Sequence, residues 1–183
     1  MTDRIAAGRP AGVRYHVLFL CTGNSARSIL AEALLNRMGE GRFIAHSAGS
    51  QPKGEPHPMA LKVLRGHGFE TAGLRSKSWH EFAGPDAPPI DLVITVCDNA
   101  AGESCPVWPG HPVAAHWGIE DPAAVEGDRQ ALAFERALHY LRNRILLLLA
   151  LPLDSIDELA LRASLREIGA SEGATSGEQA SDA

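Results

Sequence analysis

The most reactive residue type in this chain lies at the start of a short small-residue segment. Cys21 opens the run Cys-Thr-Gly-Asn-Ser-Ala-Arg, which ends at Arg27 and follows the apolar stretch Val17–Leu20. The apolar stretch predicts a strand, and the pattern after Arg27 predicts a helix. Backbone N–H groups of such a loop and a helix N-terminus attract a tetrahedral anion. The same positive end favours a thiolate, so the segment indicates nucleophilic thiol chemistry on an oxyanion.

The other side chains of this loop have assignable roles. The Arg27 guanidinium can bind two oxygens of one anion, while Asn24 and Ser28 can hold the loop and donate to the sulfur. The simpler interpretations are turn formation by Asn24, N-capping by Ser28 and a merely buried cysteine. The predicted oxyanion-binding set is Thr22, Gly23, Asn24, Ser25, Ala26, Arg27 and Ser28.

Two further cysteines follow a second apolar run. Cys97 comes directly after Asp91–Val96, and Cys105 follows it in Cys-Asp-Asn-Ala-Ala-Gly-Glu-Ser-Cys. A reaction that delivers two electrons needs a dithiol that can be oxidised to a disulfide. The alternative is that both are buried structural thiols. Because no Cys-x-x-Cys or His-x-x-x-His pair occurs among the 3 cysteines and 8 histidines, we expect no metal site.

Composition excludes several classes of protein. The chain has 183 residues, 45% apolar content and a net charge of −5, and it has no cluster of basic residues. A nucleic-acid partner is therefore not expected. The longest apolar run, Ile145–Leu153, is about half of the ~20 residues that a membrane span requires. With no signal-peptide pattern, the sequence predicts a cytoplasmic protein without a structural disulfide framework.

Strand and helix patterns alternate along the chain. This alternation predicts an α/β fold, doubly wound, with a four-stranded mostly parallel sheet and helices on both faces. The carboxyl ends of such strands share one rim, where ligands bind. The predicted strands are Tyr15–Leu20, Arg42–His46, Asp91–Val96 and Pro112–Trp117. One predicted helix follows Arg27, and a second covers Met59–Gly66. A third begins at Pro122 and ends before Pro152.

We divide the chain into four parts. A flexible leader at 1–13 precedes a catalytic domain at 14–151, an extra C-terminal helix at 152–168 and a disordered tail at 169–183. The last helix is predicted from Leu161, Leu165 and Ile168 on one face, with Ser155 and Glu158 as a capping box.

The loop from Cys21 to Ser28, the strand before it and Asp121-Pro122 about a hundred residues later resemble the low-molecular-weight protein tyrosine phosphatase superfamily. That superfamily contains phosphatases and thiol-coupled arsenate reductases, and the matching features run from about Tyr15 to Leu148. The resemblance implies that Asp121 is the general acid, with Glu120 as the neighbouring alternative. Asp121 also has the position of a helix N-cap.

Cys97, Cys105 and the segment Ala115–Pro122 resemble the arsenate reductase branch. The resemblance implies a relay in which Cys21 attacks arsenate, Cys97 attacks Cys21 and arsenite leaves. Cys105 then attacks Cys97, and the resulting disulfide is reduced by thioredoxin. The spacing exceeds one helical turn, so we expect the segment between Cys97 and Cys105 to move or partly unwind.

The rival branch, a phosphatase that hydrolyses phosphate monoesters through a cysteinyl-phosphate, uses the same loop. Its members commonly have aromatic residues after the Asp-Pro that grip a tyrosine ring, whereas Ala123 and Ala124 follow here. This favours a small inorganic oxyanion such as arsenate over phosphotyrosine. A non-catalytic oxyanion or redox sensor is the third alternative.

Two further expectations come from the resemblance. Some relatives hold a potassium ion under the loop, and Asn24, Glu32 and Ser47 match that site, but Ser78 stands at the position of its aspartate. The predicted potassium site is therefore incomplete. Related reductases use glutaredoxin or mycothiol, whereas the third cysteine favours thioredoxin as the electron donor, with no bound cofactor.

Overall fold

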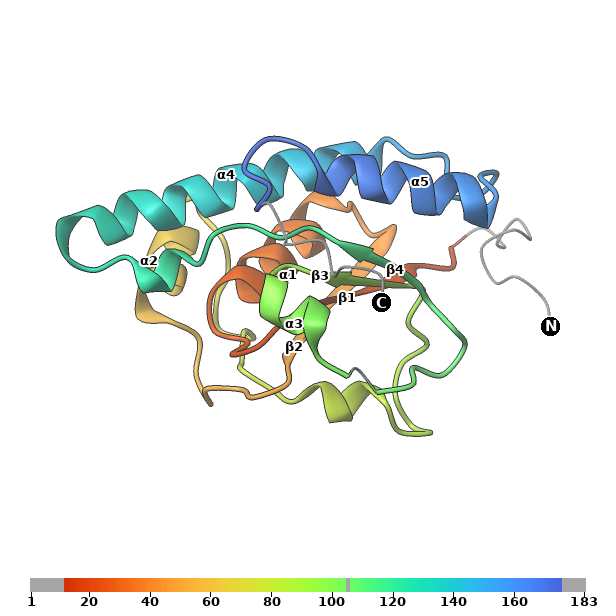
Figure 1. Cartoon of the computed structure of the whole chain (residues 1–183), viewed down its shortest axis with the longest axis horizontal. Coiled ribbons are helices and arrows are strands. Elements are labelled where there is room, and N and C mark those ends of the chain that lie inside the picture. The colour runs from red at the N-terminus through yellow and green to blue at the C-terminus, as the bar shows by residue number, and fades with distance from the viewer. Residues whose placement is uncertain (1–11, 105, 176–183) are drawn as a thin grey trace, which may run out of the picture.

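We describe a computed structural model, which covers residues 12–104 and 106–175 (Figure 1). Most of the expected leader, residue Cys105 and the end of the expected tail lie outside these residues. Within them, no helix is both long and apolar enough to cross a membrane.

A four-stranded sheet with all strands parallel forms the centre of the molecule. The strand order is β2-β1-β3-β4, so the first strand of the chain lies inside the sheet and pairs on both sides. This confirms the predicted fold class, and it places Cys21 and the residues after β3 and β4 at one rim. The strands are β1 (Tyr15–Cys21), β2 (Phe43–Gly49), β3 (Leu92–Thr95) and β4 (Val113–His116).

The helices cover the sheet unevenly. In Figure 1, α4 and α5 run along the same side of the molecule, and they share one buried cluster with α1, α2 and one face of β1. A smaller cluster around Leu18, Trp79 and Phe82 covers the other face. The α-helices are α1 (Arg27–Met38), α2 (Pro58–Gly66), α3 (Asp98–Gly102), α4 (Gln130–Leu149) and α5 (Glu158–Gly169), and the 3₁₀ helices are η1 (Trp79–Phe82), η2 (Pro122–Ala124) and η3 (Gly127–Arg129).

Two predicted helix starts are wrong. The long helix α4 begins at Gln130 rather than at Pro122, because Gly127 has a φ of 69° that no helix accommodates. Pro122 instead begins the short η2. Helix α5 is capped by Asp157, whose side chain accepts from the Ala160 N–H at 2.9 Å, and not by Ser155. The Ser155 hydroxyl donates to the Pro152 carbonyl instead.

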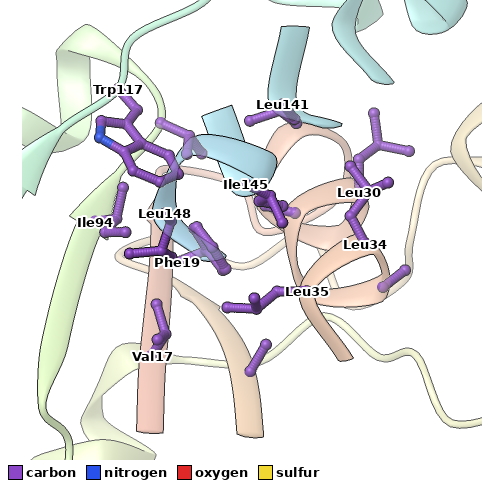
Figure 2. Close-up of a cluster of buried hydrophobic side chains, with 14 of the residues drawn as sticks. Val17, Phe19, Leu30, Leu34, Leu35, Ile94, Trp117, Leu141, Ile145 and Leu148 are labelled. Carbon is purple, nitrogen blue, oxygen red and sulfur yellow. The ribbon is translucent and has the colours of Figure 1, made fainter. Parts of the chain in front are cut away.

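The main core lies between β1 and the long helices. Figure 2 shows Phe19 of β1 beside Leu148 of α4, and Leu30, Leu34 and Leu35 along α1 in the same cluster. These side chains are at most 1% exposed. Burial of a side chain of this size stabilises the fold by about 1.5–3 kcal/mol. The core thus holds α1, and with it the end of the cysteine loop, firmly against the sheet.

Helix α5 and the residues after it pack against β4, an edge strand of the sheet. The Trp117 indole donates to the Leu165 carbonyl at 3.0 Å, and a β-carbon at Gly169 would collide with the His116 carbonyl. The expected disordered tail began at Gly169, yet Thr175 donates from its backbone N–H to the Gly118 carbonyl at 3.1 Å. Residues 169–175 are therefore part of the packed structure, which the polar composition of this stretch did not indicate.

A half-buried histidine, His46, makes the stability of this fold depend on pH. Burial, and then the nearby His16 and Lys77, lower the pKa of His46 to about 4. Its unfolded value is about 6.5, so between these values the unfolded chain binds the proton and the folded chain does not. Stability is therefore lost as the pH falls from about 6.5 towards 4.

Wild type loses stability between pH 7.5 and pH 5, and we predict that His46→Gln loses about 1 kcal/mol less over the same range. This figure is reduced for the partial exposure of the ring. Urea unfolding at both pH values measures this, with the exposed His139→Gln as the matched control. Equal pH dependence in wild type and His46→Gln would contradict it.

Candidate functional site

Cys21 is the last residue of β1, and the loop 22–26 leads directly into α1. The loop carbonyls of Thr22, Gly23 and Ser25 accept hydrogen bonds from backbone N–H groups of the segment 51–57, at 2.8–3.0 Å. In a planar trans peptide unit the following N–H points the opposite way. Three loop N–H groups are therefore turned away from that segment, which is the arrangement that an oxyanion-binding loop requires.

The loop lies unusually close to the end of β2. A β-carbon at Gly49 would collide with the carbonyl oxygens of Thr22 and Cys21. Glycine is therefore required at the strand end where Cys21 and Gly49 pair. This contact fixes the first turn of the loop against the sheet.

Asn24 is the centre of the hydrogen bonds that hold the loop. It has a left-handed backbone with a φ of 41° and a fully buried side chain. Its Nδ2 donates to the hydroxyls of Ser28 and Ser47, both at 2.9 Å, and its Oδ1 accepts from the Lys77 N–H at 2.7 Å. Both donors of the amide and one of the two lone pairs of its oxygen are therefore used. The strained backbone persists because these bonds determine it.

The Ser28 hydroxyl is directed at the nucleophile. It lies 2.9 Å from the Cys21 sulfur, and because its oxygen already accepts from Asn24, its single proton is available to the sulfur. The sequence-based role of Ser28 as a donor to the thiolate agrees with this geometry. Ser28 is not the N-cap of α1, since Ala26 has that position and makes no side-chain cap bond.

Burial has a larger effect on the pKa of the Cys21 thiol than the loop has. Cys21 is 4% exposed, and burial raises the pKa of its thiol. Nearby Cys97 raises this pKa further, whereas the Ser28 hydroxyl, the Ser28 N–H and Arg27 oppose the rise. The loop and Arg27 lower the Cys21 pKa as expected, but the cost of burying a negative charge exceeds their effect, so the net direction is upward.

Arg27 and Asp121 meet across the rim. The Arg27 Nη2 lies 3.4 Å from the Asp121 Oδ2, and Nη1 donates to the Ile119 carbonyl at 2.9 Å. Asp121 also caps η2 by accepting from the Ala123 N–H at 3.1 Å. The carboxylate is 40% exposed and is therefore accessible to solvent. Glu120 is exposed beside it, and both line a cavity of about 560 Å³.

Cys97 lies on the same rim, as the shared strand ends predicted. Its sulfur is 3.7 Å from the Thr22 hydroxyl of the loop, and it caps α3 by accepting from the Ala100 N–H at 3.4 Å. Cys97 and Cys21 are both buried and form no disulfide. Cys105, the third predicted thiol, lies outside the described residues. The structure thus brings two of the three cysteines to one loop.

Two positioning groups on this rim were not found from the sequence. The buried Arg144 of α4 donates to the Trp117 carbonyl at 2.7 Å, which fixes the backbone that leads to Asp121. His116 bridges Thr95 and Asp98 at 2.8 and 2.9 Å, and Thr175 also donates to Asp98 at 2.8 Å. Arg144 falls within the apolar stripe of α4 in the sequence, so only its burial reveals its role.

The predicted potassium residues surround a lysine instead. The Lys77 ammonium lies 3.3 Å from Glu32 Oε2 and 3.4 Å from the Ser47 hydroxyl. Ser78, at the expected aspartate position, caps η1 through the His80 N–H. Across 12–104 and 106–175, no group of three or more His, Cys, Asp and Glu residues could hold a metal ion. Because the Lys77 ammonium already lies between Glu32 and Ser47, the residues present do not fit a bound potassium ion.

A buried cysteine in a fixed N–H loop, with an arginine and an aspartate at one rim of a parallel sheet, is the set of groups that cysteine-dependent enzymes use on oxyanions. The chain belongs to the low molecular weight phosphotyrosine protein phosphatase family, whose model matches residues 16–159.

Several relatives of this chain are arsenate reductases. The one from Bacillus licheniformis is 37% identical over 115 residues, which cover 62% of this chain and 78% of that protein. A solved structure described as an arsenate reductase in the phosphate binding state is 28% identical, has a TM-score of 0.61, and covers 74% of this chain and 97% of its own. A thioredoxin-dependent arsenate reductase from Corynebacterium glutamicum is 28% identical, has a TM-score of 0.52, and covers 73% of this chain and 61% of its own.

We predict that Ser28→Ala raises the Cys21 pKa further, because it removes a hydrogen bond to the thiolate, and a hydrogen bond to a charged group contributes about 1.5–3 kcal/mol. The rate of Cys21 alkylation by iodoacetamide against pH measures this, in a background of Cys97→Ser and Cys105→Ser. Ser155→Ala, an exposed serine, is the control. An unchanged midpoint would show that Ser28 does not stabilise the thiolate.

Proposed function

We propose that this protein is an arsenate reductase that converts arsenate to arsenite through a three-cysteine relay. The observation that carries the proposal is the second buried thiol, Cys97, whose sulfur lies at the edge of the Cys21 loop beside Thr22. Hydrolysis of a phosphate ester needs only one thiol, whereas reduction needs a second one within reach. The arsenate reductases among the relatives support the same activity.

In the first step the Cys21 thiolate attacks the arsenic of arsenate, and a sulfur–arsenic bond forms while an arsenic–oxygen bond breaks. The loop N–H groups and Arg27 bind the remaining oxygens, and Asp121 gives its proton to the oxygen that leaves as water. Arg27 connects these two events, because its guanidinium already contacts the Asp121 carboxylate.

In the second step the Cys97 thiolate attacks the Cys21 sulfur. A Cys21–Cys97 disulfide forms, the sulfur–arsenic bond breaks, and its electron pair stays on arsenic, which leaves as arsenite. The Cys105 thiolate then attacks Cys97 and releases Cys21 as a thiolate. A dithiol reductant finally reduces the Cys97–Cys105 disulfide. For these steps Cys97 must release its cap on the Ala100 N–H, so the first turn of α3 must open.

We further propose thioredoxin as that reductant and the cytoplasm as the compartment. An intramolecular disulfide is the substrate that thioredoxin attacks, and one structural relative is described as thioredoxin-dependent. A reducing compartment also keeps the two buried thiols in the free form that the relay needs. Ala123 and Ala124 after Asp121 leave no aromatic side chain there to bind a tyrosine ring, which favours inorganic arsenate as the substrate.

The test is purified protein with thioredoxin, thioredoxin reductase and NADPH, in which NADPH loss is followed after arsenate is added. Arsenate-dependent loss that disappears in Cys105→Ser is expected. Absence of any loss, together with fast hydrolysis of p-nitrophenyl phosphate, would assign the protein to the phosphatase branch, which uses the same Cys21, Arg27 and Asp121.

We predict that Cys97→Ser lowers arsenate turnover by at least about a thousandfold, since a hydroxyl cannot complete the disulfide. Hydrolysis of p-nitrophenyl phosphate should stay within about tenfold of wild type, because only Cys21 is needed for that reaction. Both rates are measured on the same preparation. Arsenate reduction by Cys97→Ser at the wild-type rate would contradict the relay.

A further inference from the structure

Lys77 is the most buried lysine side chain near the site, and it belongs to no step of the proposed reaction. It is 7% exposed, and its ammonium lies among three oxygens. These are Glu32 Oε2 at 3.3 Å, the Ser47 hydroxyl at 3.4 Å and the Arg75 carbonyl at 3.1 Å. An ammonium has three N–H donors and no acceptor, so each donor has one partner. A buried charge of this kind is retained only when it is paired and fully hydrogen-bonded.

A continuous chain of hydrogen bonds connects the Lys77 ammonium to the Cys21 sulfur. Ser47 accepts from Lys77 and from Asn24, and it donates its proton to Glu32. Asn24 in turn donates to Ser28, whose hydroxyl contacts the Cys21 sulfur. Ser47 therefore has its one donor and both lone pairs in use, and its orientation is fixed by the charge on either side of it.

The carboxylate in this cluster needs a positive partner. Glu32 is 13% exposed, and burial raises its pKa, an effect that Lys77 and Ser47 oppose. Without a cation, a buried Glu32 would take up a proton or change its hydrogen bonds, and Ser47 and Asn24 would lose their alignment. Oxygen atoms of a carboxylate, a hydroxyl and a carbonyl are also the donors that bind hard metal cations.

We propose that the ammonium group of Lys77 takes the place of a bound monovalent cation beneath the oxyanion loop, and that it positions the loop through Ser47 and Asn24. Lys77 is a positioning residue, since it contacts neither the thiol nor the oxyanion. Phosphate binding and thiol chemistry of the loop are then independent of potassium in the wild-type protein. The inference applies to arsenate reduction and to phosphate hydrolysis alike, so it stands or fails separately from the proposed function.

Lys77→Ala is the variant that tests this, because it removes the ammonium and leaves the backbone N–H that binds Asn24. It also leaves room for an ion among the three oxygens. Lys77→Met is the matched variant, since its apolar side chain fills the same space and admits no ion. Lys62→Ala on α2, an exposed lysine, controls for loss of charge alone.

The measurement is the dissociation constant for inorganic phosphate, by calorimetry, in choline, ammonium and potassium chloride at equal ionic strength. In choline chloride we expect both Lys77 variants to bind phosphate about ten- to a hundredfold more weakly than wild type. Ammonium or potassium ions should restore most of the affinity in Lys77→Ala and none in Lys77→Met. Wild type and Lys62→Ala should bind equally in all three salts.

Three results would overturn the proposal: wild-type affinity of Lys77→Ala in choline chloride, no rescue of Lys77→Ala by either ion, or equal rescue of Lys77→Met. If Lys77→Ala does not fold in choline chloride, its refolding yield becomes the measurement. A yield that rises with potassium or ammonium in Lys77→Ala and not in Lys77→Met supports the proposal, and equal failure in every salt overturns it.

Discussion

A buried thiolate must be stabilised by groups that are already in place, because water cannot reach it to solvate the charge. Cys21 is 4% exposed, so its sulfur depends on the Ser28 hydroxyl, on nearby N–H groups and on Arg27. These groups are effective only while Asn24 keeps its left-handed backbone. The chain of hydrogen bonds that links Lys77 to Ser28 through Ser47 and Asn24 is therefore the constraint to which the rest of the site is adjusted.

The parallel sheet brings the residues of this site together at one rim. Its strand order places the first strand at the centre, so Cys21 lies between Gly49 of β2 and the residues that follow β3. Because all four strands are parallel, each of them ends at the same rim, and residues distant in sequence meet there. Arg144 and helix α5 then fix the last part of the rim from the helical side.

Sequence patterns predicted the features that are local or periodic. The strands, the helix after Arg27 and the common rim of Cys21 and Cys97 were predicted because apolar runs and small-residue loops act over short distances. The start of α4 was missed because the left-handed Gly127 outweighs the helical preference of Pro122. Lys77 was missed because a lysine between two serines indicates a solvated turn, and only the tertiary contacts with Glu32 and Ser47 reveal its burial.

The segment that follows α5 is the last part of the rim to be synthesised. Ala174 pairs with Ile119 and Thr175 binds Asp98, so the rim is complete only after these residues have left the ribosome. Cys21 emerges much earlier, and at about 5–20 residues per second the interval is roughly eight to thirty seconds. Until the strands and helices that surround it have been synthesised, the Cys21 thiol lacks its buried environment. The nascent chain, more than the folded enzyme, is thus the form most exposed to irreversible oxidation at Cys21.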